Sequence, residues 1–229
     1  MKDDFSAFDF HIHSQYSYDS LCTIRAITKA AKRRNLSGFA ITDHNTLQGA
    51  VKASLCNSEM AVIIGEEIST DQGDIIGLFL HEEVKPGQIL DVIDQIRDQD
   101  GLIVLPHPFK KNLSPSPEVV ANVDIIEVLN GRRPPEMNRK AAALAEKHDL
   151  PGIGGSDAHL ACEVGRVQTV FNQDITDPED IRRLITQKKA TVEGTESSQY
   201  VHYPSVLIGS VRTGNYRKLV KSAVKRIPF

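Results

Sequence analysis

The chain has 229 residues, of which 40% are hydrophobic and 25% charged, and its formal net charge is -3. These values are ordinary for a globular protein, and the length allows one barrel-type α/β domain or two small domains. The weak negative charge argues against stable binding to duplex DNA or to an anionic membrane, but bound metal ions could still attract a small phosphorylated substrate.

The first strand carries the residues that organise the rest of the chain. Residues 8–13 alternate apolar and polar side chains, as a strand does. His11 and His13 therefore point to the same side and can bind one metal ion at the end of the strand. An isolated pair of this kind is more often a pair of partly exposed histidines. Four further clusters of the same chemistry follow apolar runs later in the chain, and this repetition favours a metal site.

Strands and helices alternate along the remaining sequence, which predicts a parallel α/β sheet. Every polar cluster falls at the C-terminal end of a strand, where ligands gather in barrels and open sheets. Convergence from five or six strands favours a closed barrel. We expect one domain over residues 1–229, in which 196–229 form an extension whose role the pattern does not indicate, with a possible basic helix at 216–226. The other predicted strands are 39–42, 61–64, 74–80, 102–105, 124–129, a short strand at Ile153 and 167–171. Helices are predicted after Thr23, Pro86, Pro134 and Asp177, and a short helix after Thr46.

Eight side chains at these strand ends and in the first loop are the candidate metal ligands. Five imidazoles and three carboxylates, with no thiolate, suit Mn, Fe or Zn better than Mg or Ca. Three carboxylates neutralise only part of the charge of two or three divalent ions, so the pocket would stay positive and could hold phosphate. Such ions can also lower the pKa of a bound water to supply hydroxide. The candidates are His11, His13, Asp19, His44, Glu67, His107, Asp157 and His159.

Two neighbours of these ligands need separate interpretation. Glu66 competes with Glu67 for the ligand role, and only one can enter the site because neighbours on a strand point to opposite faces. Asp43 is expected to orient a ligand imidazole rather than to bind metal. The remaining histidines are expected to lie outside the ligand set: His81, His148 and His202.

Cationic side chains that follow strand ends are candidates for binding a phosphorylated substrate. Arg132, Arg133 and Lys110 could contact substrate oxygens, and arginine is favoured for bidentate contact. For each of them taken singly, a solvated loop charge is an equally good interpretation. The sequence contains no phosphate-binding P-loop, nucleophile elbow or dinucleotide fingerprint.

The three cysteines, Cys22, Cys56 and Cys162, form no C-x-x-C pair. We therefore expect neither a disulfide scaffold nor a zinc–thiolate site. The N-terminal residues include no apolar signal core, and no apolar run approaches the length that spans a bilayer. These features predict a cytoplasmic protein without a membrane partner.

Taken in order, the polar motifs resemble those of the PHP superfamily, named after polymerase and histidinol phosphatase. The resemblance covers residues from about 8 to about 195, and the ordered set is far more specific than any one motif. The matching segments are His11-x-His13 with Asp19, residues 41–46 (Ile-Thr-Asp-His-Asn-Thr), residues 65–68 (Gly-Glu-Glu-Ile), His107-Pro108 and residues 155–159 (Gly-Ser-Asp-Ala-His).

The resemblance implies a distorted seven-stranded (β/α) barrel of TIM-like type, with the active site at the C-terminal ends of its strands. It also implies two or three Mn, Fe or Zn ions. By position, His11, His13, Glu67 and Asp157 would hold one ion, Glu67 would bridge to a second ion that His107 also binds, and Asp19, His44 and His159 would hold the third. Many members have a further histidine ligand before the last motif. This chain has only His148 and Asn130 there, which leaves one metal position open.

The resemblance further implies a stand-alone, metal-dependent phosphoesterase. Its substrate would be a small phosphorylated metabolite, a nucleotide or a short oligonucleotide, attacked by metal-bound hydroxide. Our own hypothesis adds that a metal-site histidine, His44 or His159, or a water protonates the leaving oxygen, and that Asp157 is essential for turnover. Histidinol-phosphate phosphatase is the nearest alternative. A non-catalytic metal-binding module and a metal-assisted hydrolase of non-phosphate bonds are the others.

Overall fold

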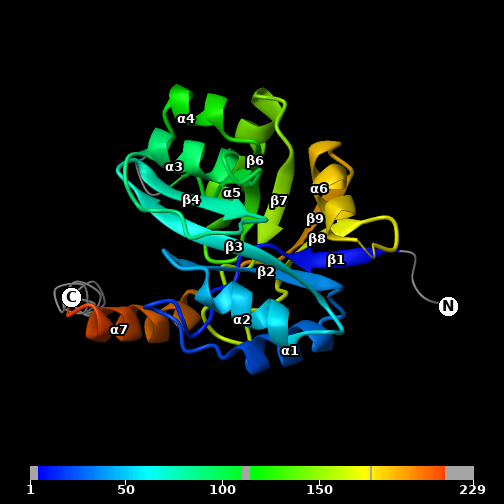
Figure 1. The fold of residues 1–229 in the computed structure, drawn as a ribbon, viewed down its shortest axis with the longest axis vertical. Helices are drawn as coiled ribbons and strands as arrows, with labels where there is room; N and C mark the ends of the chain where they lie inside the picture. Colours follow the sequence, from blue (N-terminus) through cyan, green and yellow to red (C-terminus); the bar gives the residue numbers. More distant parts are fainter. Residues whose placement is uncertain (1–4, 110–113, 176, 215–229) are drawn as a thin grey trace.

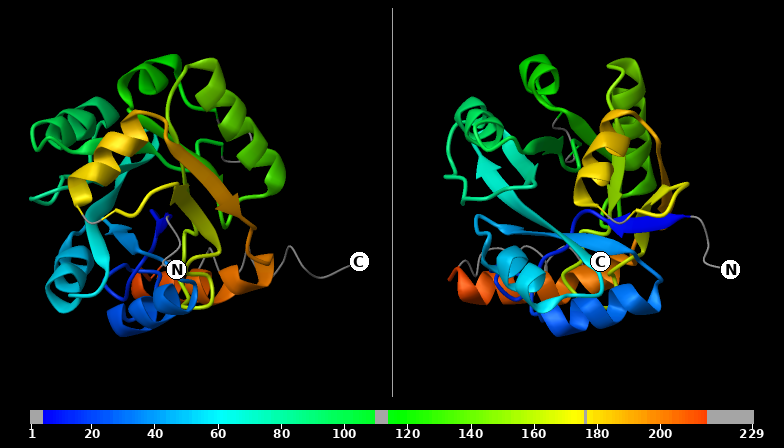
Figure 2. Two further views of the ribbon diagram at one scale, coloured as in Figure 1. Left: turned by 90° about the vertical axis from the view of Figure 1, so that its right-hand side faces the viewer. Right: turned by 45° about the vertical axis from the view of Figure 1, so that its right-hand side comes forward.

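The structure is a computed structural model that describes residues 5–109, 114–175 and 177–214. Within these ranges nine strands form one sheet in the order β7-β6-β5-β4-β3-β2-β1-β8-β9. The sheet curls on itself with helices around its outside (Figures 1 and 2). The strands are β1 Ser6–Asp9, β2 Gly38–His44, β3 Ala61–Thr70, β4 Gly73–Leu78, β5 Leu102–Leu105, β6 Ile125–Asn130, β7 Gly152–Gly155, β8 Val167–Phe171 and β9 Ala190–Gly194.

The helices connect these strands and end the described chain. None of the described helices is both long and apolar enough to cross a membrane. Their bounds are α1 Ile24–Arg33, α2 Gln48–Cys56, α3 Ile89–Arg97, α4 Pro117–Asn122, α5 Pro135–Lys147, α6 Pro178–Thr186 and α7 His202–Arg212, with a 3-10 turn at Gln199–Val201.

The pairing of the strands makes a nearly closed barrel. Strands β1, β2 and β3 run parallel, as do β5, β6 and β7, while β4 lies antiparallel between the two groups. Strand β8 continues the sheet antiparallel to β1, and β9 pairs antiparallel with β8. Gly154 on β7 closes the ring, because its carbonyl accepts from the N–H of Phe10 at 3.4 Å and its N–H donates to Thr169 Oγ1 on β8 at 2.8 Å. The barrel class is confirmed, with nine strands rather than the seven that the resemblance implies.

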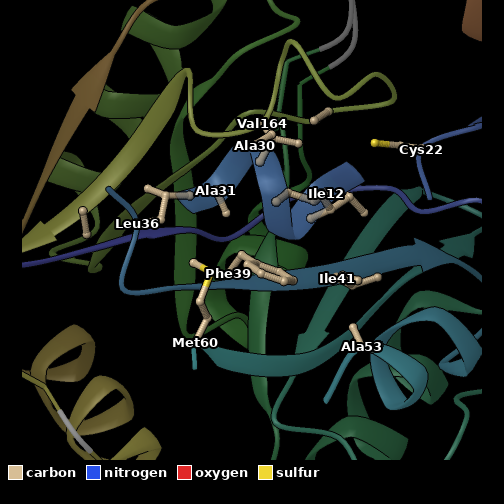
Figure 3. Close-up of a cluster of buried hydrophobic side chains, with 14 residues drawn as sticks. Ile12, Cys22, Ala30, Ala31, Leu36, Phe39, Ile41, Ala53, Met60 and Val164 are labelled. Atoms are coloured by element: carbon tan, nitrogen blue, oxygen red, sulfur yellow. The ribbon is translucent and has the colours of Figure 1, made fainter. Parts of the chain in front are cut away.

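Apolar side chains fill both faces of the central strands, which is why these strands hold their positions. On β2, Phe39 and Ile41 pack outward against Ala30 and Ala31 of α1, in the cluster that Figure 3 shows. Ala40 points the other way, into the barrel interior with phenylalanines of β1 and β8. After this apolar run, β2 ends in the polar residues Asp43 and His44.

Three described elements were not predicted: α4, β9 and α7. Strand β1 also ends at Asp9, before the histidines, and Ile12 makes only an isolated bridge to Ala158. The predicted basic helix at 216–226 lies outside the described residues, as does Lys110.

Candidate metal centre

All eight predicted ligands meet at one end of the barrel. They come from strand ends and from the loop after β1, so the parallel arrangement of the strands brings together residues up to 148 positions apart. The loop after β1 provides His11, His13 and Asp19; β2 ends in His44; β3 contains Glu67; His107 follows β5; and Asp157 and His159 follow β7.

Left-handed backbone turns aim two of these side chains. His107 has φ of 31° and Asp157 has φ of 53°, values that non-glycine residues rarely adopt. Beside them, Gly155 allows β7 to approach the first loop, because a Cβ there would lie 2.2 Å from His11 Cβ. The backbone after β5 and β7 therefore directs His107 and Asp157 towards the histidines of the first loop.

The ligand atoms form three overlapping groups, and within each group they lie within 4.8 Å of one another. Nearly all of these side chains are buried, and His11 and His13 each belong to two groups. The groups are His13, Asp19, His44 and His159; His11, Glu67 and His107; and His11, His13 and Asp157.

In two of the imidazoles, one ring nitrogen donates a hydrogen bond, so the other ring nitrogen has a free lone pair that can bind a cation. His159 Nδ1 lies 2.9 Å from the carbonyl oxygen of Asp157, which can only accept, so Nδ1 carries the proton. His159 Nε2 is then an acceptor that faces another acceptor, Asp19 Oδ2, at 3.0 Å. His11 repeats this pattern, with Nδ1 bonded to Glu127 Oε1 at 2.9 Å and Nε2 facing Glu67 Oε2 at 3.4 Å. This is the tautomer of a metal-binding histidine.

The spacing of the facing atoms also suits a metal ion. Two ligands on a tetrahedral ion with bonds of about 2.0–2.1 Å lie about 3.3 Å apart. His13 Nε2 lies 3.2 Å from Glu67 Oε2 and 3.4 Å from Asp157 Oδ1. These residues therefore fit a divalent cation both in donor chemistry and in distance.

Glu67 lies at the centre of the arrangement. Its Oε2 is 3.3 Å from His44 Nδ1 and 3.4 Å from His11 Nε2, while its Oε1 is 2.9 Å from His107 Nε2. Burial acts to raise the pKa of Glu67, but the surrounding imidazoles outweigh it and hold the pKa well below its usual value. Glu67 therefore remains a carboxylate, with Oε2 directed at three imidazoles and Oε1 at the fourth.

A cavity of about 530 Å³ opens over these groups. Six of the eight predicted ligands line its wall, so the metal groups are accessible from the cavity. The rest of the wall includes Tyr18, Arg132, Arg133, His202, Val206 and Gly209.

Comparison with known proteins identifies the family. A model described as PHP-associated matches residues 135–190. An uncharacterized protein of Methanocaldococcus jannaschii is 37% identical over 185 residues, which cover 76% of this chain and 74% of that protein. A two-domain protein of Bacteroides vulgatus containing a predicted PHP-like metal-dependent phosphoesterase superposes with a TM-score of 0.73 at 18% identity, over 88% of this chain and 69% of that chain. The chain belongs to the PHP superfamily.

Two further solved structures share this fold. An amidohydrolase of Chromobacterium violaceum with bound sulfate has a TM-score of 0.61 at 18% identity, over 80% of this chain and 97% of that one. A lesion-specific endonuclease of Pyrococcus furiosus has a TM-score of 0.63 at 19% identity, over 82% of this chain and 57% of that one. At these identities the likeness concerns the fold alone.

Sequence reasoning missed one buried carboxylate of the PHP site, Glu127 on β6. Besides binding His11, Glu127 accepts the backbone N–H of His107 at 2.7 Å and the side-chain amide of Asn130 at 2.9 Å, both at Oε2. It therefore orients two predicted ligands from different strands. A single acidic residue inside the apolar run 125–129 was the available signal.

A second missed carboxylate, Glu163, holds the loop after β7. Its Oε2 accepts the N–H groups of His159 and Leu160, each at 3.0 Å. Arg132 binds the same carboxylate through Nε at 2.9 Å and Nη2 at 2.7 Å, and its Nη1 donates to Ser205 at 2.8 Å. Arg132 thus lines the cavity, but most of its guanidinium is already engaged. Arg133 also lines the cavity, and its buried Nε has no protein partner.

The remaining predictions have clear outcomes. Asp43 does not orient an imidazole in the described structure. Its carboxylate instead accepts two hydrogen bonds from Ser14, from the backbone N–H at 2.5 Å and from the side-chain hydroxyl at 2.6 Å. Glu66 points away from the site, as strand geometry requires. None of the three histidines expected outside the ligand set belongs to a metal group among the described residues, although His202 lines the cavity.

Proposed function

We propose that the protein is a metal-dependent phosphoesterase that acts on a small phosphorylated metabolite, a nucleotide or a short oligonucleotide. The observation that carries this proposal is the set of three overlapping ligand groups, joined by His11 and His13, at the base of an open cavity. Two or three Mn, Fe or Zn ions held there would activate water and neutralise the negative charge of a phosphate group.

The protein's own side chains have separate roles in this proposal. Glu67, Asp157 and the surrounding histidines hold the cations and so fix where the phosphate sits. Arg133 lines the cavity wall, where its positive charge would support an anionic substrate. Arg132 provides positive charge and orders the wall through Glu163 and Ser205.

Protonation of the leaving oxygen requires an acid at the cavity surface. His44 suits this role better than His159, because its side chain is 13% exposed, against 6% for His159. The two nitrogens of His159 also lie closer to their partners, at 2.9 Å from the Asp157 carbonyl and 3.0 Å from Asp19. Those of His44 lie 3.3 Å from Glu67 and 3.5 Å from Asp19. We therefore assign delivery of this proton to His44, through a water in the cavity when His44 holds a cation, and a holding role alone to His159.

A hydrolase of a non-phosphate bond is the second candidate, supported by the fold shared with the amidohydrolase of C. violaceum. The same ligand groups could activate water for attack on a carbonyl carbon. The arginines on the cavity wall favour an anionic substrate and therefore the phosphoesterase.

The test is hydrolysis by metal-free protein with and without added Mn(II). The substrates are a phosphomonoester, a phosphodiester, nucleoside monophosphates, histidinol phosphate, a short oligonucleotide and a panel of amides and carboxylic esters. We expect Mn(II)-dependent release of phosphate or of a nucleotide, and loss of this activity in Asp157→Ala. Glu146→Ala, which removes an exposed carboxylate of α5, is the matched control and should keep full activity.

Each result assigns the protein to one reaction. The ratio of monoester to diester turnover separates metabolite phosphatases from nucleases, and selective turnover of histidinol phosphate would identify the histidinol-phosphate alternative. Turnover confined to amides or carboxylic esters would replace the phosphoesterase by the second candidate. No turnover in protein shown to be metal-loaded would favour the non-catalytic module.

A further inference from the structure

Helix α7 contains none of the family motifs, yet it forms one wall of the cavity above the metal groups. Its residues His202, Val206 and Gly209 line the cavity. In Figure 1, α7 is the last coloured helix and lies beside the dark-blue loop that follows β1. That loop carries Asp19, which lies farther beyond the end of a strand than the other predicted ligands.

The last residue of α7 binds the backbone on both sides of Asp19. Arg212 Nη1 donates to the carbonyl oxygen of Ser17 at 2.9 Å and to that of Ser20 at 3.1 Å. Both contacts join residues more than 190 positions apart in the sequence. One cationic group therefore clamps the four-residue segment in which Asp19 lies.

The packing of α7 against the same segment is equally close. A Cβ on Gly209 would lie 3.0 Å from Asp19 Cβ and 3.5 Å from the ring of Tyr18, so glycine allows the helix to approach. Tyr18 in turn stacks on His44, with ring centroids 4.8 Å apart. Helix α7 thus supports two members of the group formed by His13, Asp19, His44 and His159.

The position of Asp19 matters because its carboxylate completes that group. Its Oδ2 lies 3.0 Å from His159 Nε2 and 3.5 Å from His44 Nε2, and its Oδ1 accepts from Ser17 Oγ at 2.9 Å. A carboxylate on a loop has more freedom than one on a strand, and ordering it costs conformational entropy when an ion binds. A contact that orders the loop beforehand lowers this cost.

We propose that Arg212 is a positioning residue for one divalent-cation site, the one formed by His13, Asp19, His44 and His159. It fixes the backbone around Asp19 without touching the ion. The proposal deepens the proposed function because it concerns the same metal centre. It depends only on cation binding and does not require that the substrate be a phosphate ester.

The experiment measures cation affinity without any substrate. Metal-free wild-type protein, Arg212→Gln, Arg212→Lys and Asp19→Ala are titrated with Mn(II) and with Zn(II) in competition with a chelator of known affinity. Arg97→Gln is the matched control, because Arg97 Nη2 on α3 donates to the carbonyl of Asn122 at 2.8 Å, the same kind of contact away from the metal centre. Thermal unfolding of each metal-free variant reports the general cost of losing such a contact.

We expect Arg212→Gln to weaken one cation by about 10- to 100-fold, the usual effect of removing a residue that orients a ligand. The affected ion should be the one that Asp19→Ala loses, and the remaining ions should bind as in the wild type. Arg212→Lys should recover part of the affinity, since an ammonium can still donate to the carbonyls. Arg97→Gln should bind all ions normally at a comparable loss of thermal stability.

The proposal would be overturned if Arg212→Gln kept the wild-type cation affinity or lost affinity equally at every site. The same loss of affinity in Arg97→Gln would also overturn it. Failure of the wild type to bind a cation that depends on Asp19 would overturn it as well. A protein that passes these tests but hydrolyses no ester would refute the proposed function and leave the role of Arg212 intact.

Discussion

Glu66 and Glu67 are consecutive, chemically identical and both almost fully buried, yet β3 places them in opposite surroundings. Glu67 faces the barrel end, where four imidazoles lie within 3.4 Å of its oxygens. Glu66 faces the other side of the strand. Its Oε2 accepts one backbone N–H, from Val84 at 3.0 Å, and its Oε1 has no protein partner.

The pKa values of the two carboxyl groups follow their partners. Burial raises the pKa of Glu66 to about 7, because one N–H does not compensate for lost hydration and Glu83 adds a like charge. Burial acts on Glu67 in the same direction, but the imidazoles reverse the outcome and lower its pKa. Burial alone therefore does not mark a functional carboxylate, whereas convergence of several imidazoles does.

Of the substitutions that test this comparison, replacing Glu67 should reduce turnover the most. Glu67→Gln keeps the size of the side chain but removes the negative charge that the four surrounding imidazoles share. We expect a loss of turnover on the order of 1,000-fold, equivalent to about 4 kcal/mol of transition-state stabilisation, together with loss of at least one bound ion. Steady-state kinetics and metal analysis of the purified protein measure both. Near-normal turnover in the metal-loaded variant would exclude a bridging role for Glu67.

Glu127→Gln should have an intermediate effect, because Glu127 acts through His11 and His107. Its carboxylate accepts hydrogen bonds from three donors, and glutamine offers only one acceptor oxygen in its place. We expect metal affinity or turnover to fall by about 10- to 100-fold. Competition with a chelator measures this change. A loss as large as that of Glu67→Gln would instead make Glu127 a ligand, and no loss would make its contacts purely structural.

The difference between Glu67 and Glu127 also explains what the sequence could and could not predict. Glu67 lies in a short motif at a strand end, so local pattern and the family resemblance both point to it. Glu127 is a single acidic residue in an apolar strand, and its partners lie 20 and 116 positions away. Only the closed barrel brings them together.

The same reasoning applies to the rest of the fold. Apolar periodicity predicts most of the barrel strands and the capped helix after Thr23, because those signals are local. It does not predict the clamp between Arg212 and the Asp19 loop, which joins residues more than 190 positions apart. The predicted role of Asp43 was wrong for a related reason. Its motif indicates a metal centre, but only the structure shows that the Asp43 carboxylate binds Ser14 and not an imidazole.

Glu66→Gln should have the smallest effect on activity, and its effect on stability should depend on pH. Because the folded protein raises the pKa of Glu66 from 4.5 to about 7, the folded state holds this proton more tightly than the unfolded state. The resulting stabilisation is complete below about pH 4.5 and is lost as the pH rises towards 7. Glutamine cannot ionise, so the variant should escape this loss and be more stable than the wild type at pH 8, by about 1 kcal/mol.

Urea unfolding of the metal-free proteins at pH 5 and pH 8 measures this change, and metal content and turnover serve as controls. We expect the variant to gain stability relative to the wild type at pH 8 only, with both controls unchanged. A loss of bound metal in Glu66→Gln would show that the two faces of β3 are coupled. Unchanged metal content would instead confirm that the two neighbouring residues act separately. Strand geometry directs them to opposite sides of β3, so Glu67 faces the metal centre and Glu66 is a buried side chain that binds a proton.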